Sequence, residues 1–344
     1  VPAHTVTVLD GIRAALGKGD KLIYEQGCPC IGDDLLESVF SECKSEGRPG
    51  FSARYWNNVN HEGKVDVETR VMTPFNFCTS GATVFAPGVN LTDFSATYNA
   101  TYVPKASGEV IFDVYSFGKG RLLVNQKEAM SFYNSHGGNK QSYALQVEAG
   151  KKYDIELQFE YLQSDAQLNF DMGFKKKVDI AKSVNAVRNA DVFVGGISPS
   201  LEGEEMGVDL PGFKKGDRTS IELPEVQRNL LAALHRAGKK VILVNCSGSP
   251  VGLVPETETC EAILQAWYPG QQGGRAVADV LFGDYNPAGR LPVTFYRNIE
   301  QLPDFEDYNM IGRTYRFMKE RPLFPFGYGL SYTTFTYGPA TFDK

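Results

Sequence analysis

The feature that most constrains this chain is its hydrophobic periodicity, which changes twice along the sequence. Residues 5–47 and the residues from 174 onward place apolar residues at helical spacing, with short apolar runs between them. Residues 48–173 instead alternate apolar and polar residues, as in Ser107–Tyr115 and Lys152–Tyr161. This pattern predicts α/β structure at both ends of the chain and half-buried antiparallel strands in the middle.

The first α/β stretch is predicted to contain a helix, a strand and a second helix. The helix at 8–16 ends before Gly17, and a short strand covers Lys21–Tyr24. Asp33 or Asp34 begins the second helix, which Gly47 ends.

The last stretch alternates strands and helices. Apolar strands are expected at Asp191–Gly195, Val241–Asn245 and Ala262–Trp267, and helices at 180–187, 224–237 and Gln272–Phe282. Strands of this kind are typical of a parallel sheet covered on both faces. Since neither α/β stretch is complete alone, we expect a mainly parallel-sheet α/β sandwich domain, residues 1–47 and 174–335, interrupted by an inserted all-β sandwich domain, residues 48–173.

The sequence lacks the residues that several kinds of binding and catalysis require. The formal charge of −6 argues against nucleic acid and anionic membranes as partners, and no apolar run is long enough to cross a bilayer. The four histidines are scattered, no GxSxG surrounds Ser249, and no Walker or GxGxxG loop follows a strand. We therefore expect no metal and no other cofactor.

Carboxylates remain as candidates. Glu202, Glu204 and Glu205 follow the strand predicted at 191–195, and Gly216-Asp217-Arg218 follows them. Ligands bind beyond the carboxyl ends of parallel strands, where this loop belongs. A solvated acidic loop is the alternative interpretation.

Long motifs in the last stretch point to a family. The segments 266–283, 286–294, 312–316 and 325–333 closely resemble the second domain of family 3 glycoside hydrolases. The resemblance implies retaining hydrolysis of β-glycosides by two carboxylates. By position it implies Glu202 as the general acid/base, with Glu205 as runner-up, and Asp217 and Arg218 as substrate-binding residues.

The same resemblance implies a missing part. In this family the nucleophilic Asp lies on an N-terminal (β/α)8 barrel, and this chain has no such segment. We expect a barrel-bearing polypeptide or segment as partner. Residues 336–344 are predicted to begin a linker or a fibronectin-like domain, and homo-oligomer formation is left open.

The insert, from Gly50-Phe-Ser-Ala-Arg-Tyr-Trp56 onward, resembles the β-sandwich domain named after the anthrax protective antigen. That resemblance implies a lectin-like module. Phe75, Phe77 and Tyr133 are candidates for stacking on sugar faces, but a place in the core or on the plain surface is the favoured interpretation for each of them.

Two functions follow from these interpretations. The first is the acid/base-bearing portion of a retaining exo-β-glycosidase that acts on terminal β-glucosides or β-xylosides of oligosaccharides or on aryl glycosides. The alternative is a noncatalytic carbohydrate-binding or assembly module.

Overall fold

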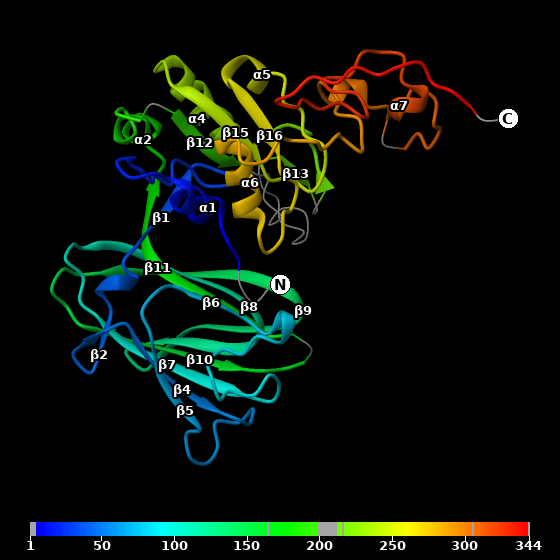
Figure 1. Ribbon diagram of the computed structural model, residues 1–344. Coiled ribbons are helices and arrows are strands. Elements are labelled where there is room, and N and C mark those ends of the chain that lie inside the picture. Colours follow the sequence, from blue (N-terminus) through cyan, green and yellow to red (C-terminus); the bar gives the residue numbers. More distant parts are fainter. Residues whose placement is uncertain are drawn as a thin grey trace. The chain divides into compact units, whose positions relative to one another are not determined.

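The computed structural model describes residues 5–163, 165–190, 192–197, 212–214, 217–304 and 306–342, and the chain forms two compact units (Figure 1). One unit contains Asp34–Lys177 and the other contains His4–Asp33 with Val178–Lys344. We call them the β unit and the α/β unit.

The β unit is one antiparallel sheet with a main strand order of β1-β11-β8-β10-β7-β2-β3. Strand β9 pairs with β8, β6 with β11, and β4 with β7 and β5. Two 3-10 turns, Phe40–Glu42 and Ser80–Ala82, join strands. The strands are β1 (Asp34–Ser38), β2 (Lys44–Ser45), β3 (Arg48–Pro49), β4 (Phe51–Trp56), β5 (Val67–Val71), β6 (Phe75–Cys78), β7 (Ser95–Tyr102), β8 (Gly108–Val124), β9 (Lys127–Val147), β10 (Tyr153–Glu160) and β11 (Gln167–Lys177).

Strand β8 turns the sheet from one layer into the other. Its first half pairs with β11 and its second half, from Lys119, pairs with β10. The register against β9 shifts between Ser116 and Gly118, as at a sheet corner. A Cβ at Gly120 would lie 2.1 Å from the Gln158 carbonyl oxygen, so only glycine allows this close approach.

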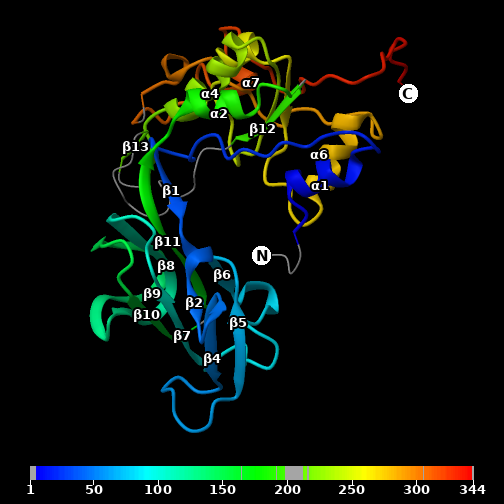
Figure 2. The ribbon, with the colours of Figure 1, turned by 90° about the vertical axis from the view of Figure 1, so that its left-hand side faces the viewer.

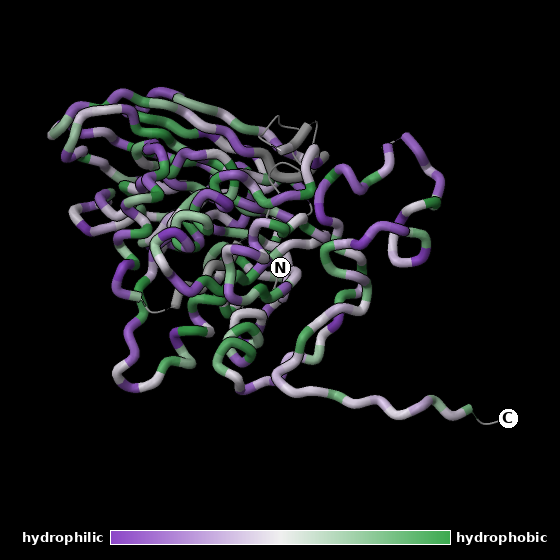
Figure 3. The backbone as a smooth tube through the Cα atoms, turned by 90° about the horizontal axis from the view of Figure 1, so that it is seen from above, coloured by the Kyte–Doolittle hydropathy of each residue, from purple (hydrophilic) through white to green (hydrophobic). Residues whose placement is uncertain are grey.

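Aromatic rings fill the space between the two layers. Phe51 on β4 lies 5.5 Å from Phe75 on β6 and 5.8 Å from Phe170 on β11, between ring centroids. Tyr98 on β7 lies 4.6 Å from Phe75. Strands β7, β8 and β10 alternate more buried and less buried residues, and Figure 3 shows hydrophobic and hydrophilic residues interleaved along the strands. The period of two therefore predicted this core correctly.

Two of the elements predicted in the first stretch are wrong. The second helix, expected after Asp33 or Asp34 and ending at Gly47, is instead β1, a 3-10 turn and β2, and β1 pairs with β11 from Asp34↔Lys177 to Ser38↔Gly173. The long-range pairing overrides the helical spacing because it satisfies the backbone of both strands. The run Lys21–Tyr24 forms no strand, and Tyr24 is 66% exposed. The β unit thus spans Asp34–Lys177, where the sequence had placed the insert at 48–173.

The α/β unit contains a three-stranded parallel sheet of order β12-β15-β16 and a two-stranded hairpin, β13-β14. The larger sheet of the chain is antiparallel, so the expectation of a mainly parallel fold is not confirmed for the chain as a whole. A 3-10 turn covers Ile299–Gln301. The other elements are α1 (Val8–Ala15), α2 (Ile180–Ala186), β12 (Val192–Ile197), β13 (Phe213–Lys214), β14 (Asp217–Arg218), α4 (Glu225–Arg236), β15 (Lys240–Asn245), α5 (Glu256–Thr259), β16 (Ala262–Gln265), α6 (Gly273–Phe282) and α7 (Thr314–Phe317).

Helix α1 joins the rest of its unit through α6, and the two helices lie side by side in Figures 1 and 2. Thr7 caps α1 in a reciprocal capping box with Asp10. The Gly274 amide donates to the Val6 carbonyl oxygen at 2.9 Å. A Cβ at Gly11 would lie 2.0 Å from the Gly274 carbonyl oxygen, so glycine at this position permits the helices to touch.

Helix α4 packs on β15. Leu231 and Leu234 are almost completely buried with Val241 and Leu243, and Phe295 and Trp267 extend this cluster. The chain leaves for the β unit after Asp33 and returns at Val178, and the Val178 amide donates to the Asp33 carbonyl oxygen at 2.7 Å. The two crossing points are therefore adjacent in the α/β unit.

Candidate functional site at the carboxyl edge of the parallel sheet

The carboxyl ends of three parallel strands meet at one edge of the sheet. Ile197 of β12 is in register with Asn245 of β15, and Asn245 is in register with Gln265 of β16. Ligand sites of open parallel sheets lie beyond this edge, because the loops that leave it converge there. This edge is the candidate site of the α/β unit.

A chain of hydrogen bonds connects the strand ends. The Asn245 amide nitrogen donates to Gln265 Oε1 at 2.6 Å and to Ser247 Oγ at 2.9 Å. The Gln265 amide nitrogen donates to Ser247 Oγ at 3.2 Å. Ser247 Oγ donates to the Ser249 carbonyl oxygen at 2.9 Å. Both Asn245 and Ser247 are buried, so the hydrogen bond between their side chains is shielded from water.

The loop after β15 takes its shape from a glycine. A Cβ at Gly248 would lie 2.5 Å from the ring of Tyr268, which leaves no room for a side chain between the two loops. Trp267 adopts a φ of 55°, a value that is uncommon for a bulky residue and that turns the loop after β16. The close approach of these loops brings Ser249 toward the hairpin.

Arg218 ends this network on the hairpin β13-β14. Its Nη1 donates to Ser249 Oγ at 3.0 Å, and the side chain is half-buried. Arg218 also lines a hollow of about 680 Å³ together with Ser220 and Glu222. Asp217 lies in β14, in register with Lys214.

The predicted acid/base residues follow β12 in the sequence. Glu202 and its runner-up Glu205 are outside the described residues, as is the side chain of Asp217. Their roles therefore stay predictions.

The sequence interpretation missed Asn245, Ser247, Ser249 and Gln265 as members of the site. A usable signal was present, because Asn245 and Gln265 are polar residues that each close an otherwise apolar strand. An amide at the end of a buried strand needs partners, and a neighbouring strand end can supply them.

A second polar cluster lies beside the site, around Arg228 on α4. Its Nη1 contacts Glu222 Oε2 at 2.8 Å, its Nε contacts Glu256 Oε1 at 3.1 Å, and its Nη2 donates to the Gly252 carbonyl oxygen at 3.1 Å. Glu256 is 1% exposed, and burial raises the pKa of its carboxyl group against the attraction of Arg228. All three guanidinium nitrogens of Arg228 have partners, so this cluster fixes the start of α4 and α5.

The three aromatic residues of the β unit that were considered for sugar stacking differ in their burial. Phe75 is 3% exposed and packs against core rings on several sides, so it has no free face for a sugar. Phe77 is half-buried and stacks on Phe85 and Tyr98. Phe75 thus belongs to the core and Phe77 packs against it, in agreement with the favoured interpretation. Tyr133 on β9 is 65% exposed.

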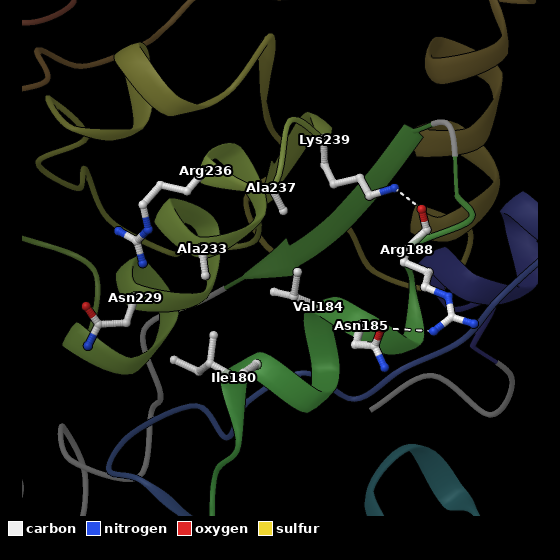
Figure 4. A pocket seen from close by; sticks show the side chains of 10 residues that line it. Ile180, Val184, Asn185, Arg188, Asn229, Ala233, Arg236, Ala237 and Lys239 are labelled. Atoms are coloured by element: carbon white, nitrogen blue, oxygen red, sulfur yellow. Dashed lines mark hydrogen bonds between the residues drawn. The ribbon is translucent and has the colours of Figure 1, made fainter.

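A groove runs between α2 and α4 (Figure 4). Ile180, Val184 and Ala233 line it, and the Lys239 ammonium donates to the carbonyl oxygens of Arg188 and Ala190. Lys239 directly precedes β15, so this end of the groove lies beside the amino edge of the sheet. Ile180 and Asn229 line both the groove and the hollow beside Arg218.

No group of three metal-ligating side chains occurs among the described residues. None of the helices in that part of the chain is long and apolar enough to span a bilayer.

Comparison with known proteins assigns the family. Residues 1–332 match the protein family described as "Glycosyl hydrolase family 3 C-terminal domain". The chain belongs to glycosyl hydrolase family 3. This agrees with the family predicted from the motifs at 266–283 and 325–333.

Relatives support the assignment. A xylan 1,4-beta-xylosidase of Xylanibacter ruminicola is 49% identical over 345 residues, which is 98% of this chain and 39% of the xylosidase. A beta-glucosidase of Rhizobium radiobacter is 31% identical, over 98% of this chain and 43% of its own length. The chain thus spans about two fifths of these family 3 relatives. Glycoside hydrolases of this kind are enzymes of class EC 3.2.1.

A solved structure shows the same fold. The beta-glucosidase of Kluyveromyces marxianus in complex with glucose matches 96% of this chain and 42% of its own chain, with a TM-score of 0.62 and 23% identity. This likeness is one of fold.

Proposed function

We propose that this chain is the acid/base-bearing portion of a retaining exo-β-glycosidase that hydrolyses terminal β-glucosides or β-xylosides. The observation that carries the proposal is the 49% identity to a xylan 1,4-beta-xylosidase over almost the whole chain. The polar carboxyl edge of the parallel sheet supports it, because β12 ends at that edge and the candidate glutamates come next in the sequence.

In the proposed mechanism two carboxyl groups share the work. A carboxylate nucleophile attacks the anomeric carbon and the bond to the leaving oxygen breaks, while Glu202 gives that oxygen a proton. Glu202 then takes a proton from water, which attacks the glycosyl-enzyme and releases the sugar with its configuration retained. Glu205 is the alternative for this role, and Asp217 and Arg218 are proposed to bind substrate.

The nucleophile is proposed to come from a barrel-bearing polypeptide or segment. Exposed apolar side chains in the α/β unit support this partner, because a surface of this kind marks an interaction site. Among the described residues, the five most exposed of them lie between residues 308 and 342: Tyr308, Ile311, Leu330, Tyr337 and Phe342.

The β unit is proposed to be an inserted, protective-antigen-like sandwich that shapes the outer sugar subsites. Its two-layer packing and the exposed ring of Tyr133 support this role. An exposed tyrosine ring can stack on the apolar face of a sugar.

The test is Glu202→Ala in the complete enzyme. Substrates with poor leaving groups need the proton, so we expect their kcat/KM to fall about 10²-fold or more. Activated aryl glycosides should lose much less in the first step. Their slow step then becomes hydrolysis of the glycosyl-enzyme, and azide should restore the rate and yield a β-glycosyl azide.

Glu205→Ala is the matched control. If azide rescue and leaving-group dependence follow Glu205 and not Glu202, the runner-up is the acid/base. If neither variant shows them, or if the complete enzyme hydrolyses no β-glycoside, the proposed function is wrong.

A further inference from the structure

Tyr268 is an exposed aromatic residue at the carboxyl edge of the parallel sheet. It lies just beyond Gln265, the last residue of β16. Tyr268 is 55% exposed, although the loop that carries it starts from a buried strand end. A ring that is more than half exposed keeps apolar surface free for a ligand.

The loop that carries Tyr268 is fixed on both sides of the residue. Before it, the ring of Trp267 packs against the buried Phe295, with 6.0 Å between ring centroids. Trp267 is held at a φ of 55°, a strained value that persists only where the surroundings enforce it. After it, the carbonyl oxygen of Gln271 accepts a hydrogen bond from the Val6 amide at 2.9 Å. The backbone of Tyr268 is therefore placed by contacts that its own side chain does not make.

Gly248 fixes the position of the Tyr268 ring. A Cβ at Gly248 would lie 2.5 Å from a ring carbon of Tyr268, and the nearest atoms around it all belong to that side chain. The φ of Gly248 lies outside the left-handed region, so the backbone there does not require glycine. Stability alone does not explain this glycine, because an exposed ring could move aside for a methyl group. The glycine lets the ring stay where it is.

A fixed and exposed aromatic ring is suited to bind a sugar. The apolar face of a sugar ring can stack on it, and a ring that is already in place loses little conformational entropy when it binds. The position of the ring favours one side of the substrate. The proposed acid/base gives its proton to the leaving oxygen, and the candidate glutamates follow β12, which ends at this same edge. Side chains at this edge therefore belong to the leaving-group side.

We infer that Tyr268, packed against Gly248, stacks on the sugar ring on the leaving-group side of the scissile bond. The inference rests on the proposed function and adds to it a substrate-binding residue in the α/β unit. Its ligand is the sugar that a β-linked oligosaccharide loses from the cleaved terminal unit. Tyr268 contacts this sugar, and Gly248 acts through Tyr268.

The first experiment compares two substrates of the complete enzyme. A β-linked disaccharide, xylobiose or cellobiose, has a sugar on the leaving-group side, whereas the methyl β-glycoside of the same terminal sugar has none. Aromatic stacking is worth about a three- to tenfold change in an equilibrium, so Tyr268→Ala should raise KM for the disaccharide by this factor with little change in kcat. KM for the methyl glycoside should stay unchanged.

Two variants serve as controls for the loss of the ring. Tyr268→Phe keeps the ring and should stay close to the wild type for both substrates. Tyr285→Ala removes a ring that is 57% exposed but follows α6 instead of a strand end, and it should leave both KM values unchanged.

The second experiment moves the ring without removing it. In Gly248→Ala the added methyl group displaces the Tyr268 side chain, so KM for the disaccharide should rise while the unfolding temperature stays close to that of the wild type. The combined variant of Gly248→Ala and Tyr268→Ala should be no worse than Tyr268→Ala alone, because the methyl group then meets no ring.

The outcomes separate the inference from the proposed function. If Tyr268→Ala raises KM equally for both substrates, or for neither, the stacking role is overturned. It is also overturned if Tyr268→Phe loses as much as Tyr268→Ala, because the hydroxyl and not the ring would then matter. Additive effects of Gly248→Ala and Tyr268→Ala would show that Gly248 does not act through the ring. If the wild-type enzyme hydrolyses no β-glycoside, the proposed function itself fails.

Discussion

The two units of this chain differ in how far their large apolar side chains are exposed to solvent. In the β unit Phe75, Phe170 and Tyr98 are completely or almost completely buried, and the ring of Phe75 contacts the rings of both Phe170 and Tyr98. In the α/β unit the buried cluster is smaller, and Tyr308 and Tyr337 are 86% and 87% exposed. The β unit closes its own core, whereas the α/β unit presents apolar surface that another polypeptide surface can cover.

The largest effect that we expect concerns the hydrolytic activity of this polypeptide by itself, and its measurement would sharpen the comparison of the two units. We expect this polypeptide, free of any other chain, to show no turnover of aryl β-glucosides or β-xylosides. Loss of the nucleophile and of substrate orientation removes several orders of magnitude in rate. Measurable hydrolysis by the isolated chain, with mass spectrometry showing no second polypeptide, would break the comparison.

The next effect is the difference in stability between removal of a buried ring and removal of an exposed ring. Phe170→Ala should lower the free energy of unfolding of the β unit by about 3–5 kcal/mol, because it removes a ring from a closed aromatic core. Tyr337→Ala should change stability by less than about 0.5 kcal/mol in this chain, because the ring is exposed. Urea unfolding followed by near-UV circular dichroism measures both, and equal costs would show that the C-terminal segment is packed.

A smaller effect concerns the buried carboxyl group of the α/β unit. Burial raises the pKa of Glu256, so the folded chain keeps the proton at a pH where the unfolded chain has lost it. The stability of the wild type relative to Glu256→Gln should therefore fall as the pH rises from the ordinary glutamate pKa through the raised one. Above that range the difference should be constant.

Chemical unfolding of both proteins between pH 4 and pH 8 checks this sign. A difference that grows with pH would show that the attraction of Arg228 for the carboxylate outweighs burial. Glu258→Gln is the matched control for the substitution itself, because Glu258 lies on the same short helix and is exposed.

The smallest effect is expected from removal of the β unit. Joining Asp33 directly to Val178 should leave the α/β unit folded, because these residues are already hydrogen-bonded at 2.7 Å. In the complete enzyme, cleavage of a small aryl glycoside should change little and preference among oligosaccharides should change more. If both substrates suffer equally, the insert supports the fold and does not shape the subsites.

The sequence by itself determined the local and repetitive features. The alternating pattern of Ser107–Tyr115 predicted antiparallel strands, and the apolar face of 224–237 predicted α4, because burial on one face imposes the period of the element. The motifs of the last stretch also sufficed for the family.

Only the tertiary structure decided the features that join distant residues. The chain at 34–38 has helical spacing but becomes a strand, because β11, more than a hundred residues later, supplies its backbone partners. The bond between Arg218 and Ser249 likewise depends on two loops that Gly248 and Tyr268 bring together. Local periodicity records which side of an element faces the core, but pairing and loop approach depend on residues far apart in the sequence, so no local pattern reveals them.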